Sequence, residues 1–212
     1  MKKMLIGVWL MFGLGGIAQA GDDPAVALGK AKSWLCMGCH GVDGNSLAPN
    51  FPKLAGQLSS DLIKQINDFK TGLRKNDLMS SVVARVEAVD VPSLAAYYAA
   101  QKRTPDSINH PEWVARGQKL FLEGDPTNGV PACVTCHGQT GAGGTTLGAG
   151  GVTLHVPALS GQHATYVATQ LRDFKSGKRS NDPDSIMRNN AAHLSDADIG
   201  TLAEYITGMQ VQ

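Results

Sequence analysis

The sequence is organised around Cys36-Met37-Gly38-Cys39-His40-Gly41, a stretch that recurs as Cys133-Val134-Thr135-Cys136-His137-Gly138. Further landmarks follow each copy in the same order. A Pro-x-Leu-x-Gly-Gln stretch occupies residues 52–57 and again 157–162, and an Asp-Phe-Lys-x-Gly stretch occupies 68–72 and again 173–177. Chance does not keep this many landmarks in register, so the chain is a tandem duplication.

The second copy differs from the first by two insertions. From the motif histidine to the shared proline there are 12 positions in the first copy and 20 in the second. The added segment, 141–154, is rich in Gly and Thr and predicts a surface loop; the other insertion lies between Asn181 and Met187. Residues 104–112 have the Pro-rich, polar composition of a linker. We therefore expect one domain at 21–104 and a second at 105–212.

The first twenty residues predict an export signal. Lys2 and Lys3 precede an apolar run that ends in Ala18-Gln19-Ala20, a small-x-small cleavage pattern. An uncleaved membrane anchor is the alternative, but a spanning helix needs about 20 apolar residues and this run is shorter. We expect cleavage after Ala20 and a protein located in a bacterial periplasm. No later stretch is apolar enough to span a bilayer, which leaves peripheral membrane association open.

The balance of charges excludes one class of function and divides unevenly between the two copies. The 212-residue chain has 19 Lys+Arg against 18 Asp+Glu, which excludes a strongly basic nucleic-acid-binding protein. Loss of residues 1–20 changes the formal net charge from +1 to −1, divided as +2 over 21–104 and −3 over 105–212. Ordinary solvated surface explains this division, and so would docking surfaces of opposite sign for two redox partners.

Hydrophobic periodicity predicts a mostly helical fold in each copy. No segment shows convincing strand alternation, so we expect an all-α protein with three or four short helices per domain, joined by long loops. Gly72 and Gly177 are expected to end the middle helices, and Ser195 with Asp198 has the spacing of a capping box. The expected helices cover residues 24–35, 62–69 and 91–101 in the first copy, and 112–122, 167–174 and 196–207 in the second.

Side chains alone are poorly suited to stabilise such a domain. Domains of under ~100 residues bury little surface and often need a metal, disulfides or a cofactor. Aromatic residues make up only 6% of the chain, and the loops 41–51 and 138–156 are long. A group that is not a side chain is therefore expected at the centre of each domain.

The Cys-x-x-Cys-His motif identifies that group, because it is the attachment signature of c-type haem. The two thiols add across the haem vinyl groups, and the adjoining histidine lies beneath the iron. A zinc site shared by the four cysteines would leave both histidines unexplained. A thioredoxin-like redox pair needs no following histidine, and disulfides at this spacing close strained rings. We predict two covalently bound haem c groups, attached at Cys36, Cys39, Cys133 and Cys136, with His40 and His137 as axial ligands.

Two methionines are predicted as the remaining axial ligands. A thioether or a second imidazole usually completes a low-spin haem. Met79 and Met187 occupy equivalent positions, each 18 residues before a tyrosine of the last helix. The body of the first domain has no histidine outside the motif. In the second domain, His155, His163 and His193 are the alternatives to Met187.

This tandem arrangement resembles the dihaem cytochrome c4 family, which consists of two class I cytochrome c domains. The resemblance covers nearly the whole chain after residue 20. It implies that the first and last helices of each domain cross, with Gly29 near Tyr97 and Gly117 near Tyr205, and that the two haems face each other across the domain interface. The matching residues are 36–41, 43–44, 50–57, 68–74, 79 and 94–98 in the first copy, and 133–137, 157–162, 173–179, 187 and 194–205 in the second.

His/Met ligation leaves no vacant position on either iron, which suits electron transfer better than bond chemistry. We therefore predict an electron carrier without catalytic residues. Its haems would cycle between Fe(III) and Fe(II), taking electrons from a quinol-oxidising complex or a dehydrogenase and passing them to a terminal oxidase or another reductase. The alternative is the electron-transfer subunit of a sulfide- or thiosulfate-oxidising dehydrogenase. A dihaem peroxidase-like enzyme would require the loss of Met187 ligation.

Overall fold

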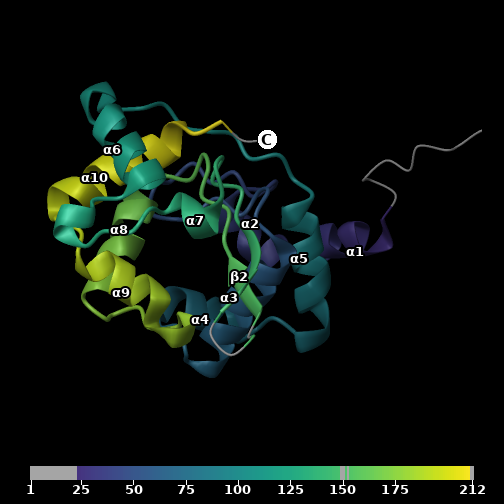
Figure 1. Cartoon of the computed structure of the whole chain (residues 1–212). Helices are drawn as coiled ribbons and strands as arrows, with labels where there is room; N and C mark the ends of the chain where they lie inside the picture. The colour runs from purple at the N-terminus through teal and green to yellow at the C-terminus, as the bar shows by residue number, and fades with distance from the viewer. Residues whose placement is uncertain (1–22, 149–150, 152, 211–212) are drawn as a thin grey trace, which may run out of the picture.

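The helices form two similar halves that lie beside each other (Figure 1). The computed structural model describes residues 23–148, 151 and 153–210, so the expected signal peptide lies outside the described residues. None of the described helices combines the length and the apolar run needed to cross a membrane. The first half contains α1 (Pro24–Lys32), α2 (Trp34–His40), α3 (Ser59–Thr71), α4 (Asp77–Val83), the 3-10 turn η2 (Ala88–Asp90) and α5 (Val91–Ala99).

Among the described residues, the second half repeats the order of the α-helices without a counterpart of η2, and it adds a 3-10 turn after its first helix, a β-hairpin, and a 3-10 turn ahead of the helix that carries Met187. The last of these turns holds Asp184 and Ser185 in the left-handed region, with φ of 53° and 58°. The elements are α6 (Pro111–Glu123), η3 (Pro126–Asn128), α7 (Val134–His137), β1 (Gly144–Leu147), β2 (Thr153–Val156), α8 (Ala164–Lys175), η5 (Pro183–Ser185), α9 (Ile186–Ala192) and α10 (Asp196–Gly208).

Several helix ends follow from local sequence signals. Gly72 ends α3 with φ of 78°, a left-handed conformation that a residue with a Cβ rarely adopts. The capping box at the start of α10 is confirmed, with Ser195 and Asp198 each bonded to the backbone of the other. The expected helix over 24–35 instead breaks at Ser33, whose buried hydroxyl donates to the carbonyl of Lys30 at 2.8 Å. This bond competes with the helical backbone pattern and separates α1 from α2.

The prediction of a loop over 141–154 is wrong for residues 144–147 and 153–154, which belong to an antiparallel hairpin. Strand β1 pairs with β2 so that Gly144 lies opposite Val156 and Leu147 opposite Thr153. In β2 the side chains alternate, and Leu154 and Val156 are each only 8% exposed. The apolar burial of these two residues holds the hairpin in place despite the glycine-rich composition around it; β2 contacts α3 of the first half, and β1 contacts α7 of the second. The fold remains mostly helical.

The first and last helices of each half cross at a glycine, as the family resemblance implies (Figure 1). A Cβ added to Gly29 of α1 would lie 1.9 Å from the carbonyl oxygen of Ser93 in α5. A Cβ added to Gly117 of α6 would lie 2.0 Å from the carbonyl oxygen of Thr201 in α10. The two helix backbones are therefore in direct contact, which only glycine permits.

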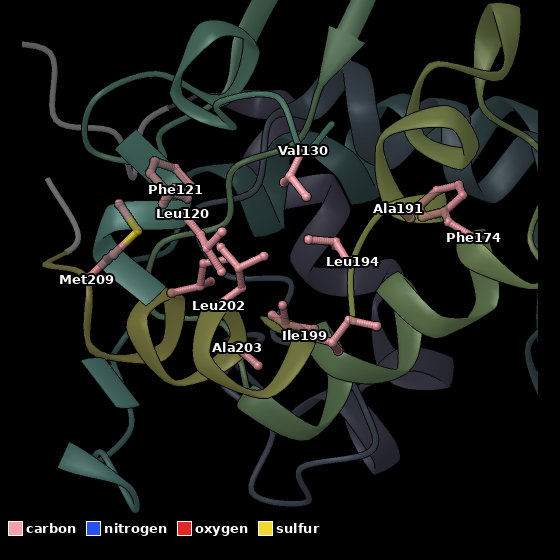
Figure 2. Close-up of a cluster of buried hydrophobic side chains, with 12 residues drawn as sticks. Leu120, Phe121, Val130, Phe174, Ala191, Leu194, Ile199, Leu202, Ala203 and Met209 are labelled. Carbon is pink, nitrogen blue, oxygen red and sulfur yellow. The ribbon is translucent and has the colours of Figure 1, made fainter. Parts of the chain in front are cut away.

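The apolar core is continuous in the second half and divided in the first. Figure 2 shows the second-half cluster, in which Leu120 and Phe121 of α6 face residues of α10. In the first half, the buried residues fall into two separate clusters, around Tyr97 and around Leu94. Cys36 is partly buried and packs against both. The first motif thus lies where the core is divided.

We expect Gly117→Ala to destabilise the second half. Alanine normally stabilises a helix relative to glycine by ~1 kcal/mol, but here its Cβ would overlap the backbone of α10, and overpacking of this kind costs ~1–3 kcal/mol. Guanidinium unfolding of the haem-loaded protein, followed by circular dichroism, measures the change. Ala115→Gly is the control, because Ala115 is an exposed residue of the same helix and its replacement measures the Ala/Gly propensity difference away from the crossing. An unfolding midpoint for Gly117→Ala at or above that of the wild type would contradict the close crossing.

Candidate haem-binding centres

Both Cys-x-x-Cys-His motifs form short helices that end in the motif histidine. Cys36 and Cys39 are three residues apart in α2, so they lie on one face of the helix. In the second half, Cys133 is the N-cap of α7, and His137 is its last residue. The glycine after each histidine has a positive φ, which turns the chain away from the helix at once.

The four motif cysteines are free thiols. The disulfide alternative is therefore not what the structure contains, and the thiols are available to form thioethers. Burial raises the pKa of the Cys133 thiol to about 11, and burial also raises the pKa of the Cys36 thiol. Both are protonated at neutral pH, so neither is set up as a thiolate nucleophile or a thiolate metal ligand.

Both motif histidines have one ring nitrogen engaged by the backbone. Nδ1 of His40 lies 2.8 Å from the carbonyl oxygen of Pro52, and Nδ1 of His137 lies 3.1 Å from that of Pro157. Because a carbonyl can only accept, Nδ1 carries the proton and donates it. Nε2 therefore keeps its lone pair in both imidazoles.

The unengaged nitrogen of His40 provides a test of whether a haem iron fits this centre. Nε2 of His40 is buried and has no hydrogen-bond partner among the described residues. A buried polar atom without a partner is costly and calls for an explanation. Burial lowers the pKa of His40 and of His137, outweighing the opposite effect of the proline carbonyl. Both imidazoles are thus neutral, which is the form that binds a metal. A haem iron bound at Nε2 of His40 would give this buried nitrogen a partner.

An apolar cavity in the second half brings four of the predicted site residues together. Its walls come from α7, β2 and α9, with one side of α10, and its empty volume is about 980 Å³ including the part open to solvent. Concave, mainly apolar sites with few polar groups are typical of cofactor pockets. Cys133, Cys136, His137 and Met187 line it, together with apolar residues that include Val130, Leu154, Val156, Leu159, Leu171, Leu202 and Ile206.

The two predicted methionines occupy equivalent places. Met79 is the third residue of α4 and Met187 the second of α9, and both side chains are partly buried. The side chain of Asn76 caps α4 by accepting from the Met79 backbone N–H at 3.0 Å. Helix α4 packs against α3 as α9 packs against α8. Met187 lines the cavity together with its motif residues.

The structure separates the histidine alternatives to Met187. His163 is 3% exposed, and both of its ring nitrogens are engaged, by Asp106 and by Ser46. His193 is exposed. His155 lies on the exposed side of β2 but also lines the cavity. His155 is therefore the alternative ligand that lies nearest to the second motif.

The two halves are joined by residues that the sequence did not place at a contact between the copies. Arg103 is 1% exposed and donates to the carbonyl oxygens of Ala55, at 2.7 Å, and Ser160, at 3.1 Å. Arg74 donates across the contact to Gln170 at 2.7 Å. Gln57 of the first half and Gln162 of the second also form hydrogen bonds with the backbone of the opposite half. Arg74 and the glutamines stand out in the sequence as members of the repeat, but repetition alone does not say that they meet.

Known proteins resemble the chain over its whole length. A family model described as cytochrome c matches residues 114–210. Cytochrome c4 of Pseudomonas aeruginosa is 45% identical, with the match covering 99% of this chain and 100% of that protein. A protein of Thiomonas intermedia called thiosulfate dehydrogenase electron acceptor is 36% identical over 81% of this chain and 76% of its own length.

A solved structure agrees with these matches. The crystal structure of reduced recombinant cytochrome c4 from Pseudomonas stutzeri is 42% identical and superposes with a TM-score of 0.79, covering 87% of this chain and 98% of that chain. The shared fold, the doubled motifs and the full-length identity agree with the resemblance seen in the sequence. The chain belongs to the cytochrome c4 family.

Proposed function

We propose that this protein is a dihaem electron carrier with His/Met coordination at both irons. The observation that carries the proposal is the doubled imidazole geometry, in which a proline carbonyl holds Nδ1 of each motif histidine and so leaves the lone pair on Nε2. The first centre would use His40 and Met79, and the second His137 and Met187. Cys36, Cys39, Cys133 and Cys136 would hold the two haem c groups through thioether bonds.

Each residue of a centre has a distinct task. A bound haem supplies an iron that gains or loses one electron without a change of ligands. The cysteines fix its orientation, the proline carbonyl fixes the tautomer and direction of the histidine, and the apolar walls exclude water. A haem held by a histidine and a methionine would have no iron position left for a substrate, so transfer of electrons between proteins is the activity that this ligand set would support.

Its location and domain division belong to the same proposal. We infer that residues 1–20 direct export and are removed after Ala20, which places the protein in the periplasm, where covalent haem attachment follows export. The domains would be 21–104 and 105–212, joined near 104–112; each contains its own motif and its own helix crossing. Their formal charges of +2 and −3 suit docking to two different redox partners.

A second candidate is the role of electron acceptor for a thiosulfate-oxidising dehydrogenase. The relative from Thiomonas intermedia carries that name and is 36% identical, and a similarly named protein of Stutzerimonas stutzeri is 33% identical over 90% of this chain. Stopped-flow reduction of the protein separates the candidates. The two electron donors are a thiosulfate dehydrogenase supplied with thiosulfate and a quinol-oxidising complex supplied with quinol. The donor that reduces the protein faster shows which of the two roles it has.

We expect pyridine haemochrome analysis to give two haems per chain after periplasmic expression. The double variant Cys36→Ser, Cys39→Ser should then carry one, because a hydroxyl does not form the thioether, and so should Cys133→Ser, Cys136→Ser. A single haem in the wild-type protein would contradict the dihaem proposal.

We expect Met187→Ala to halve the thioether–iron charge-transfer band of the oxidised protein. The same variant should bind carbon monoxide at one iron once reduced, because a small side chain leaves that position open. Met79→Ala should do the same at the other iron. Both are followed by optical spectroscopy.

The matched control for the second centre is His155→Ala, which removes the competing side chain of the same cavity and should leave the band unchanged. If the wild-type band corresponds to one haem only and His155→Ala opens an iron, His155 is the ligand and the assignment of Met187 is wrong.

A further inference from the structure

Gln57 and Gln162 reach across the contact and pair with the backbone of the opposite half. The side-chain amide of Gln162 accepts from the N–H of Lys53 at 2.8 Å and donates to its C=O at 3.0 Å. The amide of Gln57 accepts from the N–H of Ala158 at 2.8 Å and donates to its C=O at 3.0 Å. These residues hold equivalent places in the two copies, so the contact is a reciprocal exchange.

The exchange takes place away from water, in a fixed orientation. Gln57 is 8% and Gln162 5% exposed, and their backbone partners are buried too. Each Oε1 also accepts the N–H of the residue that follows its own glutamine, at 2.9 Å for Leu58 and 3.1 Å for His163. Because every partner of Oε1 is a donor and the partner of Nε2 is a carbonyl, only one orientation of each amide satisfies the contacts.

The peptide groups held by the glutamines are the same ones that hold the motif histidines. The N–H of Lys53 and the C=O of Pro52 belong to one planar amide. Its oxygen accepts from Nδ1 of His40, while its N–H donates to Gln162. In the second half, the amide between Pro157 and Ala158 links His137 to Gln57 in the same way.

Hydrogen bonds at the two ends of one amide strengthen each other, because each polarises the group that the other uses. An acceptor on the N–H therefore makes the carbonyl a better acceptor for the histidine Nδ1–H. A stronger bond at Nδ1 makes the imidazole a more basic ligand. A more basic ligand favours Fe(III) over Fe(II), which lowers the reduction potential of that iron.

We propose that each glutamine tunes the haem of the opposite domain: Gln162 acts on the iron bound by His40, and Gln57 on the iron bound by His137. Both are positioning residues, since they act through a peptide group and a histidine. The inference rests on the proposed function, in which these histidines are axial ligands. It makes each reduction potential depend on the docking of the two domains.

The test compares Gln162→Leu and Gln57→Leu with Gln170→Leu in the full-length, haem-loaded protein. Gln170 is the matched control because it also accepts a hydrogen bond across the contact, from Arg74, but touches neither histidine peptide. Spectroelectrochemistry gives the two potentials. Proton NMR of the reduced, diamagnetic protein gives the Nδ1–H resonance of each axial histidine.

We expect Gln162→Leu to raise the potential of the first haem and to shift the His40 Nδ1–H resonance upfield, while the second haem stays as in the wild type. Gln57→Leu should raise the potential of the second haem and shift the His137 Nδ1–H resonance upfield, while the first haem stays as in the wild type. Gln170→Leu should move neither potential. Gln162→Met is a second variant for the case that leucine disturbs folding. Its unbranched side chain keeps the length of glutamine but offers no acceptor to the Lys53 N–H, so the His40 Nδ1–H resonance should again move upfield.

Two results would overturn the inference while leaving the proposed function intact. In the first, both potentials move together in all three leucine variants, which would make the glutamines ordinary interface contacts. In the second, neither potential moves in Gln162→Leu or Gln57→Leu. Failure of the proposed function is seen separately, in the wild-type protein. A wild type without two His/Met haems, or without Nδ1–H resonances from two iron-bound imidazoles, overturns both.

Discussion

The hydrogen bond from Nδ1 of each motif histidine to a proline carbonyl is the interaction on which each centre depends. It decides which ring nitrogen carries the proton, and in the first half it leaves Nε2 of His40 as a buried lone pair without a hydrogen-bond partner among the described residues. A buried, unsatisfied imidazole nitrogen is costly in an apolar interior. The cost disappears when a metal takes the lone pair, so the same bond that prepares the ligand also makes the domain depend on its cofactor.

Because the chain is a duplication, the peptide that positions each motif histidine is also held by the opposite half. Where the two copies dock, a residue repeated in both can make the same contact with the opposite copy. Gln57 and Gln162 exchange contacts in this way, and each meets the peptide that positions the other half's histidine. In the proposed carrier, the two centres would thus be coupled through backbone amides as well as through the distance between the haems. The hairpin of the second half breaks this symmetry on one side, where β2 lines the second cavity.

Much of the fold was predictable because it rests on local signals. The helix stop at Gly72 and the capping box at Ser195 each depend on a few neighbouring residues. The hairpin was not predictable from composition, because glycines and threonines do not reveal that Leu154 and Val156 are buried by a distant surface. The break at Ser33 was missed because a side chain competes with the helix there only once that hydroxyl is buried.

The sequence by itself determined the doubled motif, the residues proposed to attach and ligate two haems, and the membership of the cytochrome c4 family. Spacing suffices for these, since thioether attachment and an adjoining imidazole are bonds between near neighbours. Only the tertiary structure decided that His163 is engaged on both nitrogens by Asp106 and Ser46, and that the glutamines cross to the opposite half. These contacts join residues more than 50 positions apart, and their geometry exists only after the helices have packed and the two copies have docked.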